Sequence, residues 1–289
     1  MPYGTFFVAG LALGAIYALS GVGLVLLYRS TGVLNLAYGA IGAAGAMLCW
    51  QLVQWGSAIE LGVFAAIVLA TTLSVAYGRL IAPHLAYRDP VVKAVATLGL
   101  ALIILGILNW IWPVNPRRLS LPTDTEGFPL LGVRVTLTRA IGFAVTVLAT
   151  LSIAIVLGKT RIGLLMRALA NNRGLASVLG VPVLRVETFA WAVSGLLAGF
   201  SGIMLGNLVR LDPSVLTFLV IPAIAAAIVG RLQSLIAALL GGIFIGVVEA
   251  MTTLIQPLAP VRSAAPFVVA AAIILWLQRK KTLTFANSD

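Results

Sequence analysis

The chain has 289 residues, of which 61% are hydrophobic and only 9% are charged. Soluble domains carry about 25% charged residues, so this composition excludes a soluble globular protein and a disordered one. It also excludes a domain held by internal disulfides, because Cys49 is the sole cysteine. What remains is a polytopic membrane protein. We attribute its formal charge of +11 to basic loops beside anionic lipid headgroups rather than to nucleic-acid binding.

Nine apolar stretches with few or no charged residues follow one another along the chain. Each is a candidate transmembrane helix, because a bilayer core needs roughly 20 apolar residues per helix. The sequence therefore predicts an all-α, polytopic integral membrane helix bundle of about 8–10 transmembrane helices, forming a single domain over residues 1–289. The stretches cover residues 5–28, 33–54, 61–82, 94–112, 140–157, 188–206, 214–230, 235–256 and 264–278.

The basic residues give this bundle an orientation. Arg29 follows the first stretch, which predicts an N-terminus outside and a first loop inside. Alternating sides from that start assigns thirteen Lys and Arg residues to the inside and six to the outside. We therefore expect a multi-pass protein with its N-terminus outside and its C-terminus in the cytoplasm.

Two connections are long enough to carry structure of their own. Residues 113–139 contain four prolines and predict an ordered external loop, within which the alternation over 133–137 allows a short hairpin. Residues 158–187 form the longest internal segment, and its apolar residues have helical spacing until Gly180 and Pro182 end the pattern. We interpret this segment as one or two short cytoplasmic helices, with Gly174 as the expected interruption.

The second apolar stretch opens with Gly32, Asn35 and Tyr38, which is unusual for a membrane helix. Broken backbone is tolerated in a membrane only where it lines a cavity or is buried in protein, so Asn35 and Tyr38 become candidates for a pathway or gate. A tight turn in which Asn35 caps the second helix explains the same residues equally well. Residues 214–256 are similarly interrupted, and we expect at least one broken or re-entrant segment.

Glu249 is the only acidic residue well inside a predicted span. A carboxylate at that depth is costly and is usually partnered or functional, so contact with substrate and pairing with a basic residue both explain it. Thr253 follows on the same helix, while Thr97 and Asn207 complete a sparse polar lining. The chain of buried carboxylates expected of a proton-driven carrier is missing from the sequence.

Enzymatic interpretations fail on spacing and composition. The run Gly158-Lys159-Thr160 resembles the end of a nucleotide-binding loop, but Ile153 stands where the first glycine is required. One histidine and one cysteine leave no ordinary zinc or haem constellation. We therefore expect a transport protein rather than an enzyme, with no cofactor bound by this chain.

Five motifs in the same order resemble those of the permease subunits of branched-chain amino-acid ABC importers, and the resemblance runs over nearly the whole length. Two positions depart from the family pattern. Tyr38 stands where the family usually has histidine, and residues 230–234 replace a Gly-Gly-x-Gly-Ser turn. The five motifs are residues 10–19, 35–39, 97–100, 167–181 and 241–250.

The resemblance implies half of a translocation pore in the bacterial inner membrane, working by alternating access. The implied solute is a branched-chain or other hydrophobic amino acid, with amides, urea and aromatic acids served by related importers. The implied partners are a second homologous permease, two ATP-binding subunits that hold ATP-Mg, and a periplasmic substrate-binding protein, besides membrane lipid.

The resemblance also assigns residues to roles, and one alternative remains open beside it. A stand-alone ion-coupled secondary transporter or channel would need its own coupling-ion site, for which Glu249 is the candidate. Under the importer interpretation, residues 158–187 are the cytoplasmic coupling segment. The residues expected in the translocation pathway or gate are Asn35, Tyr38, Thr97, Asn207, Glu249 and Thr253, and those expected to couple to the ATPase are Arg167, Ala170, Asn171, Asn172, Leu179 and Gly180.

Overall fold

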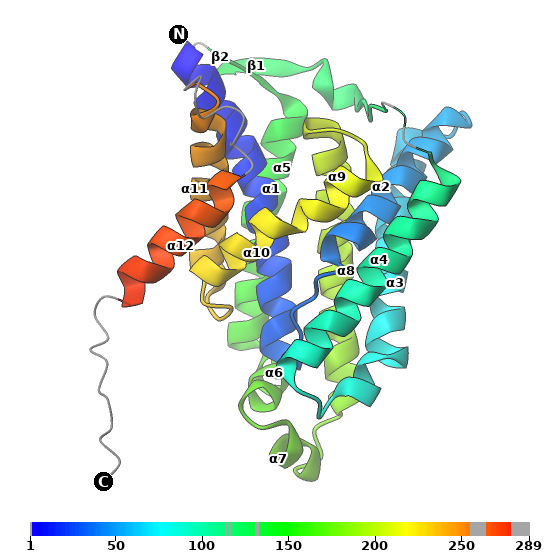
Figure 1. Ribbon diagram of the computed structural model, residues 1–289, viewed down its shortest axis with the longest axis vertical. Helices are drawn as coiled ribbons and strands as arrows, with labels where there is room; N and C mark the ends of the chain where they lie inside the picture. The colour runs from blue at the N-terminus through cyan, green and yellow to red at the C-terminus, as the bar shows by residue number, and fades with distance from the viewer. Residues whose placement is uncertain (1, 114, 116, 131–132, 255–263, 279–289) are drawn as a thin grey trace.

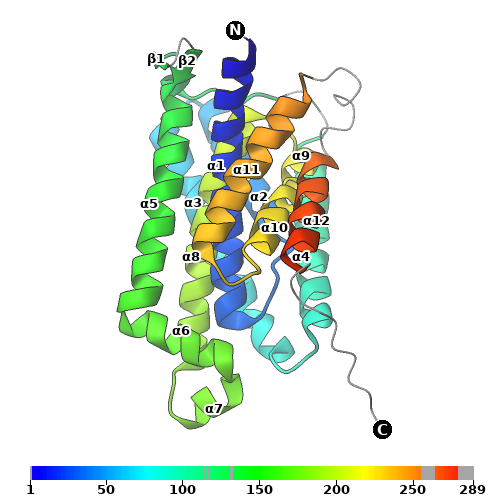
Figure 2. The ribbon, with the colours of Figure 1, turned by 90° about the vertical axis from the view of Figure 1, so that its left-hand side faces the viewer.

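The protein is a helix bundle with one small hairpin, seen in a computed structural model that describes residues 2–113, 115, 117–130, 133–254 and 264–278 (Figure 1; Figure 2). The described strands pair antiparallel, with Phe128 opposite Val135. The predicted all-α membrane class is confirmed. In chain order the elements are α1 (Pro2–Thr31), α2 (Tyr38–Gln54), α3 (Ile59–Leu80), η1 (Ala82–Leu85), α4 (Pro90–Ile111), η2 (Pro122–Asp124), β1 (Gly127–Leu130), β2 (Val133–Thr136), α5 (Leu137–Lys159), α6 (Arg161–Asn171), α7 (Arg173–Val178), α8 (Val183–Leu208), α9 (Pro213–Phe218), α10 (Val220–Val229), α11 (Leu235–Thr252) and α12 (Ala265–Gln278).

Six described helices are long and apolar enough to cross a membrane, namely α1, α3, α4, α5, α8 and α11. The other three predicted stretches are helical but shorter. α2 has 17 residues because the chain from Gly32 to Ala37 is not helical, and α12 has 14. The stretch 214–230 is divided at Leu219 into α9 and α10. The prediction of at least one broken segment is therefore confirmed.

The centre of the bundle is formed by α1 and α8. In the most apolar part of each helix, 89% of the residues of α1 and 72% of those of α8 are buried, against 22% for α3 and for α4. α1 lies directly against α11, because a Cβ at Gly14 would come within 2.6 Å of the Ile243 carbonyl oxygen and one at Gly10 within 2.7 Å of the Val247 Cα. Only glycine permits this contact between two backbones.

The two ends of the bundle are chemically different (Figure 2). The N-terminal turn of α1 lies with β1 and β2, where Val8 packs against Val133 and Val135, and we call this the hairpin end. The opposite end carries α6 and α7, and we call it the α6–α7 end. Among the described residues, ten Lys and Arg residues belong to the α6–α7 end and five to the hairpin end. This asymmetry is what the positive-inside rule expects of a cytoplasmic α6–α7 end.

Candidate translocation site and coupling surface

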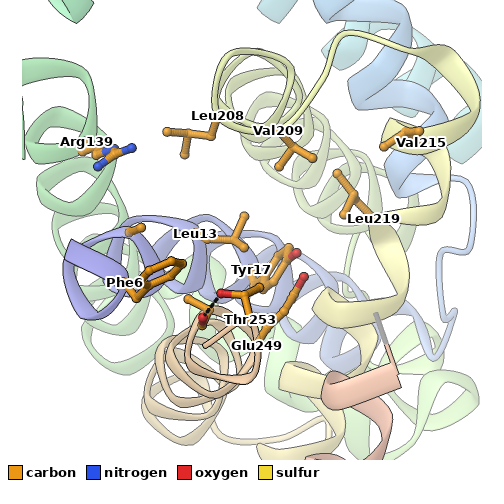
Figure 3. Close-up of a pocket in the computed structure, with 12 residues that line it drawn as sticks. Phe6, Leu13, Tyr17, Arg139, Leu208, Val209, Val215, Leu219, Glu249 and Thr253 are labelled. Atoms are coloured by element: carbon orange, nitrogen blue, oxygen red, sulfur yellow. Dashed lines mark hydrogen bonds between the residues drawn. The ribbon is translucent and has the colours of Figure 1, made fainter. Parts of the chain in front are cut away.

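A cavity of about 460 Å³ lies in the half of the bundle nearest the hairpin end, and we call it the outer pocket (Figure 3). Its walls come from α1, α5, α8, α9 and α11. The lining is mostly apolar, with one carboxylate and one guanidinium group. The lining residues are Phe6, Ala9, Leu13, Tyr17, Arg139, Leu208, Val209, Val215, Leu219, Glu249, Ala250 and Thr253.

Glu249 and Tyr17 lie side by side in the outer pocket, one from α11 and the other from α1 (Figure 3). Tyr17 is buried and Glu249 is half-buried. Thr253 follows at the end of α11, where its hydroxyl donates to the Ala250 carbonyl oxygen at 2.5 Å, and Arg139 lies across the pocket. The structure thus brings the predicted residues Glu249 and Thr253 into one site. A carboxylate beside a hydroxyl, among apolar walls, suits an ammonium group carried on an apolar body.

Tyr38 lies in a second, smaller cavity together with Ser20 and Ser201, and we call it the inner cavity. All three side chains are buried. The Tyr38 ring packs on Gly23, where a Cβ would lie 2.9 Å from the tyrosine hydroxyl oxygen. Leu219 lines both the inner cavity and the outer pocket. The break between α9 and α10 therefore lies where the two cavities adjoin.

Asn35 and Thr97 lie together at the break before α2 and do not line the outer pocket. The Asn35 Oδ1 accepts a hydrogen bond from the Ala37 N–H at 3.0 Å. The Thr97 hydroxyl accepts from the Leu36 N–H at 3.0 Å and lies 3.1 Å from the Leu34 carbonyl oxygen. Peptide groups of the break are thus paired within the protein, as a membrane requires. The structure therefore has the tight turn of one interpretation, but Asn35 is not the helix cap, because the N-cap position of α2 is Ala37 and no side chain caps the helix there.

Asn207 anchors the long loop at the hairpin end to α8. Its amide nitrogen donates to the Leu119 carbonyl oxygen at 2.8 Å and to Asp124 Oδ2 at 2.7 Å. Asp124 also accepts from the Leu121 N–H at 2.8 Å and from the Thr138 hydroxyl at 2.6 Å. One carboxylate therefore joins η2, α5 and α8 through short, charge-assisted hydrogen bonds.

The segment predicted to couple to an ATPase folds as two short helices, α6 and α7, that project from the bundle (Figure 1). α7 begins at Asn172, whose side chain accepts a hydrogen bond from the Leu175 N–H at 2.9 Å. The interruption falls at Asn172 and not at Gly174, which lies inside α7, because the asparagine side chain caps the new helix. Gly180 follows the end of α7 with a φ of +82°.

Apolar side chains are exposed on α7 and just after it. Val178 is 83% exposed and Leu179 74%, with Leu175 exposed on the same helix face, and we call these three residues the apolar knob. The knob is held from α8, because Arg173 donates to both carboxylate oxygens of Glu187 at 2.9 and 3.1 Å. An apolar surface held in place among polar residues is typical of an interaction site.

The remaining predicted coupling residues lie beside the knob rather than in it. Arg167, Ala170, Asn171 and Asn172 line one pocket at the α6–α7 end. Leu179 belongs to the knob, so the predicted set divides into a polar pocket and an apolar surface.

Three residues of these sites carry no sequence signal strong enough to single them out: Tyr17, Leu219 and Val178. Tyr17 lies beside α11 because glycines four residues apart bring α1 and α11 together. This spacing is visible in the sequence, but it does not say which two helices meet. Val178 lies three residues after Leu175, which places both side chains on one face of a helix. Nothing in the sequence marks the break at Leu219.

Comparison with known proteins points to one family. The family described as the branched-chain amino acid transport system permease component matches residues 6–277. The high-affinity branched-chain amino acid transport permease LivH of Escherichia coli K12 is 26% identical over 84% of this chain and 84% of its own length. A protein assigned as a branched-chain amino acid transport permease in Methanocaldococcus jannaschii is 28% identical over 81% of this chain and 76% of its own.

The fold also has a counterpart among solved structures. An ABC transporter described as of the metal-chelate type, in an inward-facing conformation, superposes with a TM-score of 0.54 at 16% identity, covering 94% of this chain and 85% of that one. At this identity the similarity is one of fold alone.

Proposed function

This chain belongs to the family of branched-chain amino acid transport permease components, and from that premise we propose that it is the transmembrane subunit of an ATP-driven importer of hydrophobic amino acids. It pairs with a second homologous permease in the bacterial inner membrane to form the translocation pore. The observation that supports the proposal best is the apolar knob, because three exposed apolar side chains gathered on one projecting face at the α6–α7 end suit a partner surface.

The apolar knob docks on an ATP-binding subunit. Val178 and Leu179 are almost fully exposed, and a partner that covers them gains about 25 cal/mol for each Å² of apolar surface buried. The pairing of Arg173 with Glu187 then passes movement of α7 to α8, which reaches the outer pocket at Leu208. ATP-Mg is held by the partner subunits, and this chain holds no cofactor.

Alternating access opens a path from the outer pocket through the inner cavity, which in this structure is closed to about 10 Å³, room for no more than one water molecule. A periplasmic substrate-binding protein releases the amino acid at the hairpin end, where the loop ordered by Asp124 offers a fixed surface. The ammonium group of the substrate lies at Glu249 and its apolar side chain lies against the aliphatic wall. Amides and urea lack that ammonium group, so the site favours amino acids. Leu219, between the two cavities, serves as the gate.

Substitution of Leu179 by glutamate tests the docking. We expect Leu179→Glu to lower ATP-dependent leucine uptake in proteoliposomes at least tenfold, with co-purification of the ATP-binding subunits reduced, because a carboxylate cannot be buried unpaired in an apolar contact. The matched control is Leu80→Glu at the exposed end of α3, which should leave both readouts unchanged. Full uptake and stoichiometric subunits in Leu179→Glu would show that the knob is not the docking surface.

Replacement of Glu249 by glutamine tests the pathway. Glu249→Gln keeps the side-chain volume but removes the charge that balances an ammonium group, so leucine uptake should fall about tenfold while the assembled complex is retained. Thr252→Val on the same helix, at a position outside the outer pocket, should transport normally. A Glu249→Gln chain that merely fails to accumulate in the membrane would make the carboxylate a structural group.

The second candidate function is a stand-alone ion-coupled carrier, favoured by one observation, the carboxylate in the outer pocket. Purification of the tagged chain in mild detergent, followed by mass spectrometry, separates the two. If the chain is an importer subunit, we expect ATP-binding subunits and a second permease to co-purify with it in stoichiometric amounts. A stable, abundant chain that purifies alone would favour the carrier.

A further inference from the structure

Two pockets adjoin at the α6–α7 end, and the larger one is basic. It has a volume of about 890 Å³ and lies among the end of α1, the start of α4, α6, α7 and the turn between α10 and α11. No carboxylate stands among its described lining residues. Four cationic side chains line it, namely Arg29, Lys93, Arg167 and Arg173. Like charges gathered in this way repel one another, so an anionic group between them is stabilised.

Two of these four cations are free to bind an anion directly. Arg173 is engaged by Glu187, and Arg29 donates to the Gln233 carbonyl oxygen at 2.9 Å. Lys93 and Arg167 make no salt bridge or side-chain hydrogen bond within the described part of the chain. The basic pocket therefore has fixed cations at its walls and two uncommitted ones that can close on a ligand.

The smaller pocket is a crevice of about 350 Å³ between the end of α5 and the start of α11, polar on the side that it shares with the basic pocket and apolar on the other. Leu157, Leu235 and Ile236 supply apolar walls, and Ile236 is 59% exposed. Leu240 and Phe244, further along α11, are also exposed. A crevice of this kind, on the outer face of a membrane protein, fits a hydrocarbon chain.

Arg29, Arg167 and Gln233 line both pockets, so the cations stand at the junction of a polar and an apolar space. A free phosphate ion would fill only the basic part. We propose that the two pockets together bind one anionic phospholipid of the cytoplasmic leaflet, with its phosphate headgroup among the cations and one acyl chain in the crevice. Basic pockets between transmembrane helices on the cytoplasmic side are suited to such headgroups.

The bound lipid adds a polar contact between α6 and α1, which already pack through the buried side chains of Met166 and Leu169. Its phosphate contacts Arg167 on α6 and Arg29 on α1, so it fixes the projecting helices to the centre of the bundle. This role is independent of the transported solute.

The first test measures lipid retention by native mass spectrometry of the purified complex, with phosphatidylglycerol or phosphatidylcholine of equal chain length. We expect selective retention of phosphatidylglycerol, weakened about fivefold by Arg167→Gln, since one basic residue near an anionic surface contributes about 1 kcal/mol. The matched control is Arg161→Gln, on the same helix but lining neither pocket, and it should bind normally. Equal retention of the two lipids, or no effect of Arg167→Gln, overturns the proposal.

The second test separates a lipid from a free phosphate compound. Gly158 lines the crevice, and a Cβ there meets nothing within 4 Å, so Gly158→Trp places a bulky side chain at the wall of the crevice without a backbone clash at its Cβ. We expect this variant to retain at least tenfold less phosphatidylglycerol and to bind soluble glycerol phosphate unchanged. Gly106→Trp, at a similarly open position of α4, serves as the control. Unaltered lipid retention in Gly158→Trp, with glycerol phosphate as an equal competitor, overturns the lipid assignment in favour of a free phosphate compound.

Discussion

The hairpin end and the α6–α7 end of this bundle satisfy their surface groups in opposite ways. At the hairpin end, Asp124 accepts hydrogen bonds from three neighbouring segments, and these bonds tie the loop to α5 and α8. At the α6–α7 end, the salt bridge between Arg173 and Glu187 is the one ion pair of the described residues, while a basic pocket and the apolar knob stay open. The first end thus uses a carboxylate to order its own loop, whereas the second leaves cations and apolar side chains open to other molecules.

The largest effect on stability is expected from removing the hydrogen bonds of Asp124 at the hairpin end. Asp124→Ala removes an acceptor of three hydrogen bonds and leaves the Asn207 amide with one partner fewer. At about 1.5–3 kcal/mol for a hydrogen bond to a charged group, the loss should be roughly 3 kcal/mol or more. The measurement is the thermal unfolding midpoint of the purified chain, together with the rate of proteolysis in the 117–130 loop.

The control for this loss is Glu126→Ala in the same loop. Glu126 is exposed, and its side chain makes no hydrogen bond within the described residues, so the unfolding midpoint should hardly move. Equal losses in the two variants would mean that the network around Asp124 does not order the hairpin end.

A smaller and more local effect is expected at the other end. Asn172→Ala removes the cap of α7, a loss of about 1 kcal/mol, so amide hydrogen exchange over 173–178 should accelerate and uptake should fall with the bundle intact. Asn172→Asp keeps an acceptor for the Leu175 N–H and should restore slow exchange. If the aspartate variant exchanges as fast as the alanine variant, capping is not what orders α7.

The smallest effect is a gain in stability at the turn between α10 and α11. Arg231 adopts a left-handed backbone conformation with a φ of +53°, which costs a residue with a side chain roughly 1 kcal/mol relative to glycine. Arg231→Gly should therefore raise the free energy of unfolding by about 0.5 kcal/mol, because the greater entropy of glycine in the unfolded chain offsets part of the gain. The unfolding midpoint should rise slightly with it. Gln233→Gly, two residues further on and without a positive φ, should lower the midpoint instead.

Local patterns predicted most of the elements, and long-range packing decided the site. Hydropathy located the nine helical stretches, and helical spacing in 163–172 predicted α6, because both signals lie within one segment. The partner of a buried polar residue lies far away in sequence, so the pattern could not show that Thr97 and Asn207, which we predict in the pathway, bond the backbone at Leu36 and Leu119. For the same reason, the sequence did not predict that Tyr17 and Glu249 line one pocket.

The glycine contact between α1 and α11 has a mechanical consequence. No side chain stands between the two backbones at Gly10 and Gly14, so neither helix can rotate or retreat from the other without opening a void that lipid chains would have to fill. The two helices should therefore move as one rigid body, so the distance between Tyr17 and Glu249 should stay constant through the transport cycle. Whatever widens or narrows the outer pocket must then come from the opposite wall, formed by the end of α8 and the kinked pair α9 and α10.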